Sequence, residues 1–170
     1  MTRDAVITER LVVRPPQDAD RSRFVELFGD ADFMAFATDV LTEEQAHARF
    51  DHMAEVCRAI PFGKQPVVEL ASGRIVGYTG VDHIEVDGRA WLEWGYRLAS
   101  DARGRGYATE ASLALLAKAR ETYAGELLAI IDPANVASRH VIGKLGFTFW
   151  KQTPIDGDPC DLFTLTLGDG

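Results

Sequence analysis

The chain has 170 residues, of which 46% are hydrophobic and 26% are charged, so it is long enough to bury a core, and we expect a single domain over residues 1–170. Its net charge is −8 and its basic residues are scattered outside one turn, which argues against direct nucleic-acid binding. The sequence contains no apolar run of the length that a signal peptide or a membrane span needs. We therefore expect a cytoplasmic protein with no membrane partner.

The cysteines and histidines do not indicate a metal site or a disulfide framework. Cys57 and Cys160 lie far apart in the sequence, and both are interpreted as reduced thiols. The four histidines show no spacing typical of metal ligands, so we expect no metal. The acidic net charge is compatible with a cationic or amine-bearing ligand, although solubility explains it equally well.

The first half of the chain predicts a strand, two helices and an antiparallel meander. Apolar residues alternate over residues 7–14, and they recur at helical spacing over residues 19–28, where Asp18 is placed to cap the helix. Segment 30–40 has no clear period. A capping box that begins at Thr42 predicts the second helix. Strand patterns then cover residues 67–70, 74–78, 81–86 and 90–98, and Asp87-Gly88 is a hairpin turn.

The second half alternates helices and strands. Ala108, Ala111, Leu115, Ala119 and Tyr123 mark one face of a helix, and the continuous apolar run 127–131 is typical of a strand covered on both faces. Asn135 is placed to cap a shorter helix that ends near Gly146. Two last strands are expected over residues 147–150 and 162–167, on either side of a loop that contains proline and glycine.

A basic, glycine-rich turn joins the strand that ends at Leu98 to the helix that follows. The first N–H groups of a helix lack intrahelical partners and form an anion site. Gly104 and Gly106 leave those groups open to a phosphate, and Arg103 and Arg105 add positive charge. The turn is therefore interpreted as a pyrophosphate cradle.

Three alternatives compete for this turn. A Walker-type loop is dismissed because residues 104–109 contain no lysine. A dinucleotide fingerprint is closer, but Thr109 stands where its third glycine belongs, and Glu126 precedes its strand instead of following it. The third alternative is a tight helix start without a ligand.

The motifs resemble those of the GNAT acetyltransferases. Arg103-x-x-Gly106-x-Ala108 resembles their acyl-CoA signature, and residues 104–111 are similar to the ribosomal-protein N-terminal acetyltransferase branch. Residues 8–15, 92–98 and 135–147 resemble further stretches of that branch, in the same order. The resemblance covers roughly residues 7 to 167. It implies an α/β (α+β) fold with a mixed, mostly antiparallel twisted sheet of about seven strands, two adjacent strands splayed apart, and helices on both faces.

The resemblance also implies the cofactor contacts. Acetyl-CoA would be the co-substrate, with backbone groups of Tyr96, Arg97 and Leu98 holding the pantetheine amides. N–H groups of the turn would bind the pyrophosphate, with Thr109 just inside the helix. Asn135 would bond the pantetheine arm and Ser138 would lie near the sulfur. The residues of the turn that this implies are Arg103, Gly104, Arg105, Gly106, Tyr107 and Ala108.

Glu93 is the first candidate for a catalytic base, with Ser138 as a hydrogen-bond donor to the leaving sulfur. Glu93 shares a strand face with Gly95 and Arg97, which would border the splayed cleft. The alternatives are an ordinary ion pair for Glu93 and a bond to its own helix for Ser138. His83 is an outside candidate for the acceptor pocket. Phe33, Met34 and Phe36 could line that pocket or pack in the core.

The function predicted from these features is N-acetyl transfer from acetyl-CoA to a primary amine by direct attack, because neither cysteine falls in the motif region. The acceptor is a protein N-terminus or a small-molecule amine, and the sequence does not choose between them. A non-catalytic acyl-CoA-binding module and a nucleotide-dependent oxidoreductase are the alternatives. The chain could act as a monomer or as a homodimer.

Overall fold

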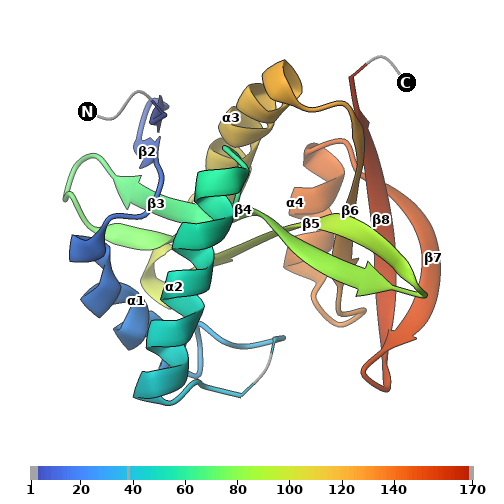
Figure 1. Ribbon diagram of the computed structural model, residues 1–170, viewed down its shortest axis with the longest axis horizontal. Coiled ribbons are helices and arrows are strands. Elements are labelled where there is room, and N and C mark those ends of the chain that lie inside the picture. Colours follow the sequence, from blue (N-terminus) through green and yellow to red (C-terminus); the bar gives the residue numbers. More distant parts are fainter. Residues whose placement is uncertain (1–3, 38, 169–170) are drawn as a thin grey trace.

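The computed structural model describes residues 4–37 and 39–168 (Figure 1). The helical elements are η1 (Asp18–Asp20), α1 (Arg21–Phe28), α2 (Glu43–Ala59), η2 (Ser100–Ala102), α3 (Tyr107–Thr122) and α4 (Val136–Lys144). The strands are β1 (Val6–Ile7), β2 (Leu11–Val13), β3 (Gln65–Glu69), β4 (Ile75–Val86), β5 (Arg89–Leu98), β6 (Gly125–Ile131), β7 (Thr148–Ile155) and β8 (Asp158–Leu167). The chain thus has the mixed α/β composition that the motifs predict.

The strands form one sheet of eight strands in the order β1-β2-β3-β4-β5-β6-β8-β7. Every neighbouring pair is antiparallel except β5 and β6, which are parallel. The sheet has eight strands instead of about seven because the predicted opening strand is divided: a turn closed by the Thr8 N–H and the Leu11 carbonyl separates β1 from β2. The prediction of a mixed, mostly antiparallel sheet is confirmed.

Helices cover both faces of the sheet. On one face Phe24 of α1 and Phe50 of α2 pack with Tyr78 of β4 in a single buried cluster. On the other face Leu115 of α3 and Ile142 of α4 belong to a larger buried cluster. In Figure 1, α1 and α2 lie at one side of the molecule, α4 and β6 to β8 lie at the other, and the β4–β5 hairpin extends between them. Among the described residues, no helix has both the length and the apolar character that crossing a membrane requires.

Strands β5 and β6 separate soon after they meet. Their parallel pairing consists of Leu92 with Leu127 and Glu93 with Leu128. Beyond Glu93, β5 remains paired with β4 up to Leu98, and β6 remains paired with β8, but the two strands no longer pair with each other. Main-chain groups of β5 that point toward β6 therefore face an opening in the sheet. This is the splayed pair of strands that the sequence resemblance implies.

Local chemistry explains most of the element boundaries. Helix α2 begins at the predicted capping box, in which Thr42 and Gln45 each accept a hydrogen bond from the other's main chain. Asp18 does not cap α1, whose N-cap is Asp20; its carboxylate instead pairs with Arg21.

The last two strands are longer than predicted. β7 and β8 form a continuous hairpin around Asp156-Gly157, both with positive φ, as in the β4–β5 turn at Asp87-Gly88. The predicted loop between residues 150 and 162 is thus mostly strand.

Candidate active site

A cleft opens between the end of β5, the start of α3 and helix α4. Ten of the residues expected to bind the cofactor line it together with Ser138, while Arg105 does not. Segment 30–37 covers part of the same cleft through Phe33, Ala35 and Phe36. The predicted residues that the fold brings together here are Tyr96, Arg97, Leu98, Arg103, Gly104, Gly106, Tyr107, Ala108, Thr109, Asn135 and Ser138.

The glycine turn places the open end of α3 against this cleft. Gly106 is the N-cap of α3 at φ +80°, and Gly104 has φ +75°, a left-handed conformation that favours glycine at both positions. A Cβ at Gly104 would meet no protein atom within 4 Å, and one at Gly106 would meet only the Arg10 guanidinium, at 3.5 Å. The space before the first N–H groups of α3 is therefore free of protein. Those features fit a phosphate-bearing ligand.

The two arginines of the turn differ in what they contact. Arg105 lies 3.3 Å from the Glu69 carboxylate, which also accepts a hydrogen bond of 2.6 Å from Tyr107. Hydrogen bonds from Tyr107 and Ser72, together with the nearby Arg105, hold the pKa of Glu69 below its usual value. Arg103 instead donates to the carbonyl oxygens of Leu98 and other main-chain groups and has no ion pair within the described chain. The expectation that both arginines serve the cradle is thus supported by position for Arg103 alone.

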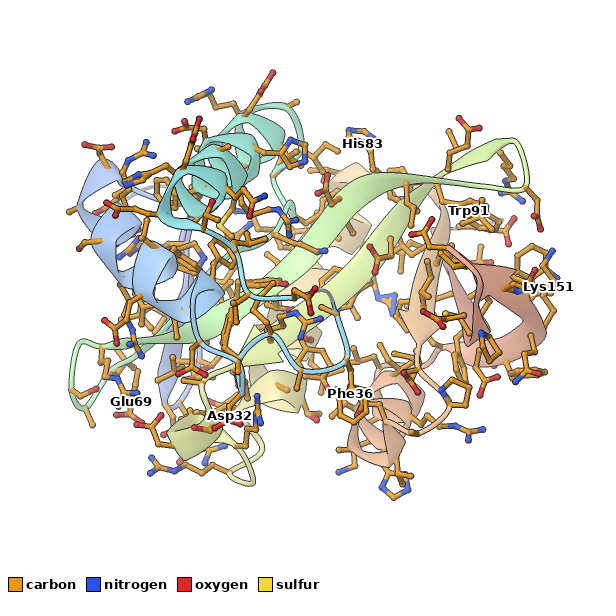
Figure 2. The ribbon with its side chains drawn as sticks, turned by 90° about the horizontal axis from the view of Figure 1, so that it is seen from below. Asp32, Phe36, Glu69, His83, Trp91 and Lys151 are labelled. Carbon is orange, nitrogen blue, oxygen red and sulfur yellow. The ribbon has the colours of Figure 1, made fainter. Side chains whose placement is uncertain are left out.

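Two arginines also hold segment 30–37 over the cleft. Arg97 donates to the carbonyls of Phe33 and Ala35 at 3.1 and 2.7 Å, and Arg103 donates to that of Asp32 at 2.6 Å. Phe36 follows with φ +64°, and 59% of its surface is exposed. Figure 2 shows Phe36 and Asp32 on this irregular segment. The segment is thus fixed in place by side chains of the cofactor strand and of the turn.

A second chamber adjoins the cleft on the side of Glu93. It shares Phe36, Tyr96 and Ser138 with the cleft and is bounded further by Lys64 and Tyr78. Glu93 sits at the last rung before β5 and β6 diverge, with 21% of its side chain exposed. Its carboxylate lies 3.7 Å from the ammonium of Lys64, not beside an arginine. The predicted base therefore faces a chamber that is continuous with the cofactor cleft.

Tyr96 and Ser138 meet where the cleft and the chamber join. Their hydroxyl oxygens are 3.0 Å apart, so the Ser138 side chain contacts β5 and not its own helix. Asn135 accepts a hydrogen bond from the Ser138 N–H at 3.1 Å, which confirms its prediction as the cap of α4. Burial raises the pKa of the Tyr96 phenol, although the bond to Ser138 partly opposes that. Both hydroxyl groups therefore carry their protons at neutral pH.

Several residues singled out from the sequence lie elsewhere. His83 lines a separate surface depression that also includes Trp91, away from the cleft; Figure 2 labels both. Met34 is buried with Phe33 in the core under α1 and α2, so of the three candidate lining residues Phe36 is the one that bounds the chamber. Residues 4–37 and 39–168 contain no group of three or more potential metal-ligating side chains.

The cysteines do not line the cleft or the chamber. Burial raises the pKa of the Cys57 thiol to about 12, and burial also raises the pKa of Cys160. Thiols with raised pKa values remain protonated at neutral pH and are poor nucleophiles. Their placement supports a reaction without an acyl-cysteine step.

Sequence reasoning missed Lys64, Tyr78 and Trp94 as parts of the site. Lys64 precedes β3 in a loop and carries no motif, so no sequence signal marks it. Trp94 is 1% exposed and lines the chamber, and its indole N–H has no hydrogen-bond partner among the described residues. Its position on the predicted strand beside Glu93 could have identified it.

Comparison with known proteins decides the family. The family model of the acetyltransferase (GNAT) domain matches residues 10–148. This chain belongs to the GNAT acetyltransferase family. The dinucleotide-binding interpretation of the turn is therefore wrong, and the sheet gives the reason: the GNAT turn here follows β5 of an antiparallel hairpin, not the first strand of a parallel array.

The GNAT fold recurs in solved relatives. A putative GNAT-family acetyltransferase from Bordetella pertussis is 27% identical with a TM-score of 0.84, covering 95% of this chain and 99% of that one. The yncA protein of Salmonella typhimurium, a putative acetyltransferase solved with acetyl-CoA, is 20% identical with a TM-score of 0.73, covering 94% and 95%. The uncharacterized protein YkkB of Bacillus subtilis (strain 168) is 27% identical over 86% of each chain. Ribosomal-protein acetyltransferases share the fold as well, in agreement with the branch that the motifs resemble.

Proposed function

We propose that this chain transfers an acetyl group from acetyl-CoA to a primary amine by direct attack. The observation that carries the proposal is the continuity of two spaces: a cleft with an open helix start and an unpaired strand edge, and a chamber that contains Glu93. The yncA neighbour was solved with acetyl-CoA, and membership of the GNAT family supports the same co-substrate here. The two spaces would hold the co-substrate and the acceptor.

The cleft suits the two polar parts of CoA. Main-chain groups along the free edge of β5, from Tyr96 to Leu98, can pair with the amides of pantetheine in the way that an added strand pairs with a sheet edge. The N–H groups at the start of α3, beyond Gly104 and Gly106, can bind the pyrophosphate. Asn135 and Ser138 line the stretch between these contacts and the chamber. Bound acetyl-CoA supplies an activated acetyl thioester.

Glu93 is the proposed base. The acceptor nitrogen donates its lone pair to form the C–N bond, Glu93 takes the nitrogen proton directly or through water, and the C–S electron pair leaves with the sulfur. A thiol with a pKa of roughly 8.5 departs as a thiolate with little help, so the Tyr96 and Ser138 hydroxyls need only donate a hydrogen bond to it. An α-amine with a pKa near 8 is ~10% neutral at pH 7, whereas a lysine-like amine is almost fully charged and depends more on the base.

The test is a thiol-release assay with acetyl-CoA against classes of amine: peptides, free amino acids, polyamines and aminoglycosides. We expect amine-dependent thiol release above background hydrolysis, and mass spectrometry should find the acetyl group on the amine. CoA binding without thiol release for every class would overturn the proposal in favour of a non-catalytic acyl-CoA-binding module. A stable acetyl group trapped on Cys57 or Cys160 would overturn direct attack.

A further inference from the structure

Lys64 has a main chain that is held rigidly beside the chamber. Its N–H donates to the Val81 carbonyl at 2.9 Å, and the Gln65 carboxamide donates to the Pro61 and Gly63 carbonyls at 3.0 and 2.8 Å. The loop can approach β4 this closely because of Gly80, where a Cβ would lie 2.5 Å from the Gly63 oxygen. The base of the Lys64 side chain is therefore fixed relative to the sheet.

The side chain of Lys64 reaches across β5 into the chamber. It passes over Gly95, where a Cβ would stand 3.3 Å from Nζ, and its ammonium lies 5.8 Å from the centre of the Tyr78 ring. Nζ is 3.7 Å from the nearer oxygen of Glu93, which is longer than a hydrogen bond. Within the described chain, neither the Lys64 ammonium nor the Glu93 carboxylate makes a hydrogen bond, although only 22% and 21% of these side chains are exposed. Both groups thus face the chamber with their donors and acceptors unused.

Lys64 keeps its positive charge in this position. Burial disfavours the charged form, but the nearby Glu93 carboxylate outweighs burial and raises the pKa of Lys64 above its ordinary value. The chamber therefore presents one positive and one negative group side by side. A ligand that matches it carries the same two charges in the opposite order.

Acceptor classes differ in how they meet this pair. A polyamine brings only positive charge, which Lys64 repels, and a peptide N-terminus brings a neutral carbonyl beside its amine. A free α-amino acid brings an ammonium and a carboxylate whose nitrogen and carboxyl carbon are about 2.5 Å apart by standard bond geometry. Those charges are spaced closely enough for the ammonium to meet Glu93 while the carboxylate meets Lys64.

We propose that the acceptor is a free α-amino acid or a close analogue with a carboxylate beside its amine, and that Lys64 selects it by binding that carboxylate. This inference rests on the proposed acetyl transfer and specifies its substrate class. It also gives Glu93 a second task, because the carboxylate that removes the proton first binds the ammonium. The carboxylate of the acceptor would take over the Lys64 ammonium and leave Glu93 to the nitrogen.

The test compares each α-amino acid with its own primary amide and with the amine that lacks the carboxylate, in the same thiol-release assay. For the best acceptor, wild-type kcat/KM should be at least tenfold higher with the acid than with the amide. Lys64→Met should lower kcat/KM for the acid at least tenfold, mainly through KM, and change that for the amide less than twofold. Lys151→Met is the matched control: its ammonium pairs with Asp87 on the exterior (Figure 2), and no kinetic change is expected.

Three outcomes would overturn this inference while leaving acetyl transfer intact. One is a wild-type preference for amides, peptides or polyamines over free amino acids. Another is an equal loss with acid and amide in Lys64→Met, which would mean that Lys64 only positions Glu93. The third is full retention of the preference for the acid in a folded Lys64→Met protein. By contrast, thiol release with no amine at all would refute the proposed function itself.

Discussion

Replacing Gly106 by leucine is expected to weaken CoA binding at the start of α3. Gly106 has φ +80°, and a Cβ there points into space bounded only by the Arg10 guanidinium at 3.5 Å, so the leucine side chain would fill the region before the helix N–H groups. A hydrogen bond to a charged group contributes roughly 1.5–3 kcal/mol. Loss of one such bond to a phosphate should raise the Kd for CoA by about 10- to 150-fold.

The same substitution also strains the main chain, and a matched control separates the two effects. A left-handed conformation costs a non-glycine residue about 1–2 kcal/mol. Gly88, in the β4–β5 turn, has nearly the same φ, +77°, and a Cβ there meets nothing within 4 Å. Gly88→Leu should therefore lose similar stability without losing CoA affinity.

Isothermal titration with CoA and thermal unfolding of both variants provide the measurement. The expected pattern is a similar fall in Tm for the two variants and a rise in Kd for Gly106→Leu alone. If both bind CoA as tightly as wild type, the start of α3 does not bind the phosphates. If both lose affinity equally, the loss reflects general destabilisation and the cradle assignment fails.

Two further changes test the base and the staple between the N-terminal strands and α3. Glu93→Gln should lower the amine-dependent rate most near neutral pH and with an acceptor of high pKa, and pH–rate profiles that fall equally at every pH would assign Glu93 a structural role. Glu110 accepts hydrogen bonds from Thr8 at 2.7 Å and from Arg10. Burial raises its pKa, but these bonds outweigh burial and lower it below 4.5, so their stabilisation is present above that pH and is lost as the pH falls through the folded-state pKa. Glu110→Gln should therefore cost about 1–2 kcal/mol in denaturant unfolding at pH 7 and progressively less below pH 4.5; an equal cost at both would refute this linkage.

Features set by local chemistry could be predicted from the sequence. The capping box at Thr42, the Asp87-Gly88 turn and the glycine turn before α3 each depend on a few adjacent residues. The family motifs then supplied the splayed strands, which no local pattern indicates. The β7–β8 hairpin shows that the local signal was also missed once, because Asp156-Gly157 is the same dipeptide as the turn that was recognised.

Contacts between distant segments could not be predicted in this way. Lys64 enters the chamber because β3, β4 and β5 pair in a particular register and because Gly95 leaves room for its side chain. Glu110 bonds with Arg10 across 100 positions of the chain. The role of Arg97 as an anchor for segment 30–37 is likewise invisible in the sequence, where it is one charged residue on a strand. Such contacts depend on tertiary structure, which residue patterns do not encode locally.

The two rungs that join β5 to β6 have a consequence for how the protein unfolds. Main-chain pairing between strands β1–β5 and strands β6–β8 ends at Glu93 and Leu128, so side-chain packing must carry the rest of their connection. Local opening of such a seam exposes amides to hydrogen exchange more readily than opening of a fully paired sheet. A bound pantetheine arm would pair with the free edge of β5 and slow that exchange, and ligand at 100 times its Kd adds about 2.7 kcal/mol to stability. The lifetime of the folded protein would then follow the supply of its own co-substrate.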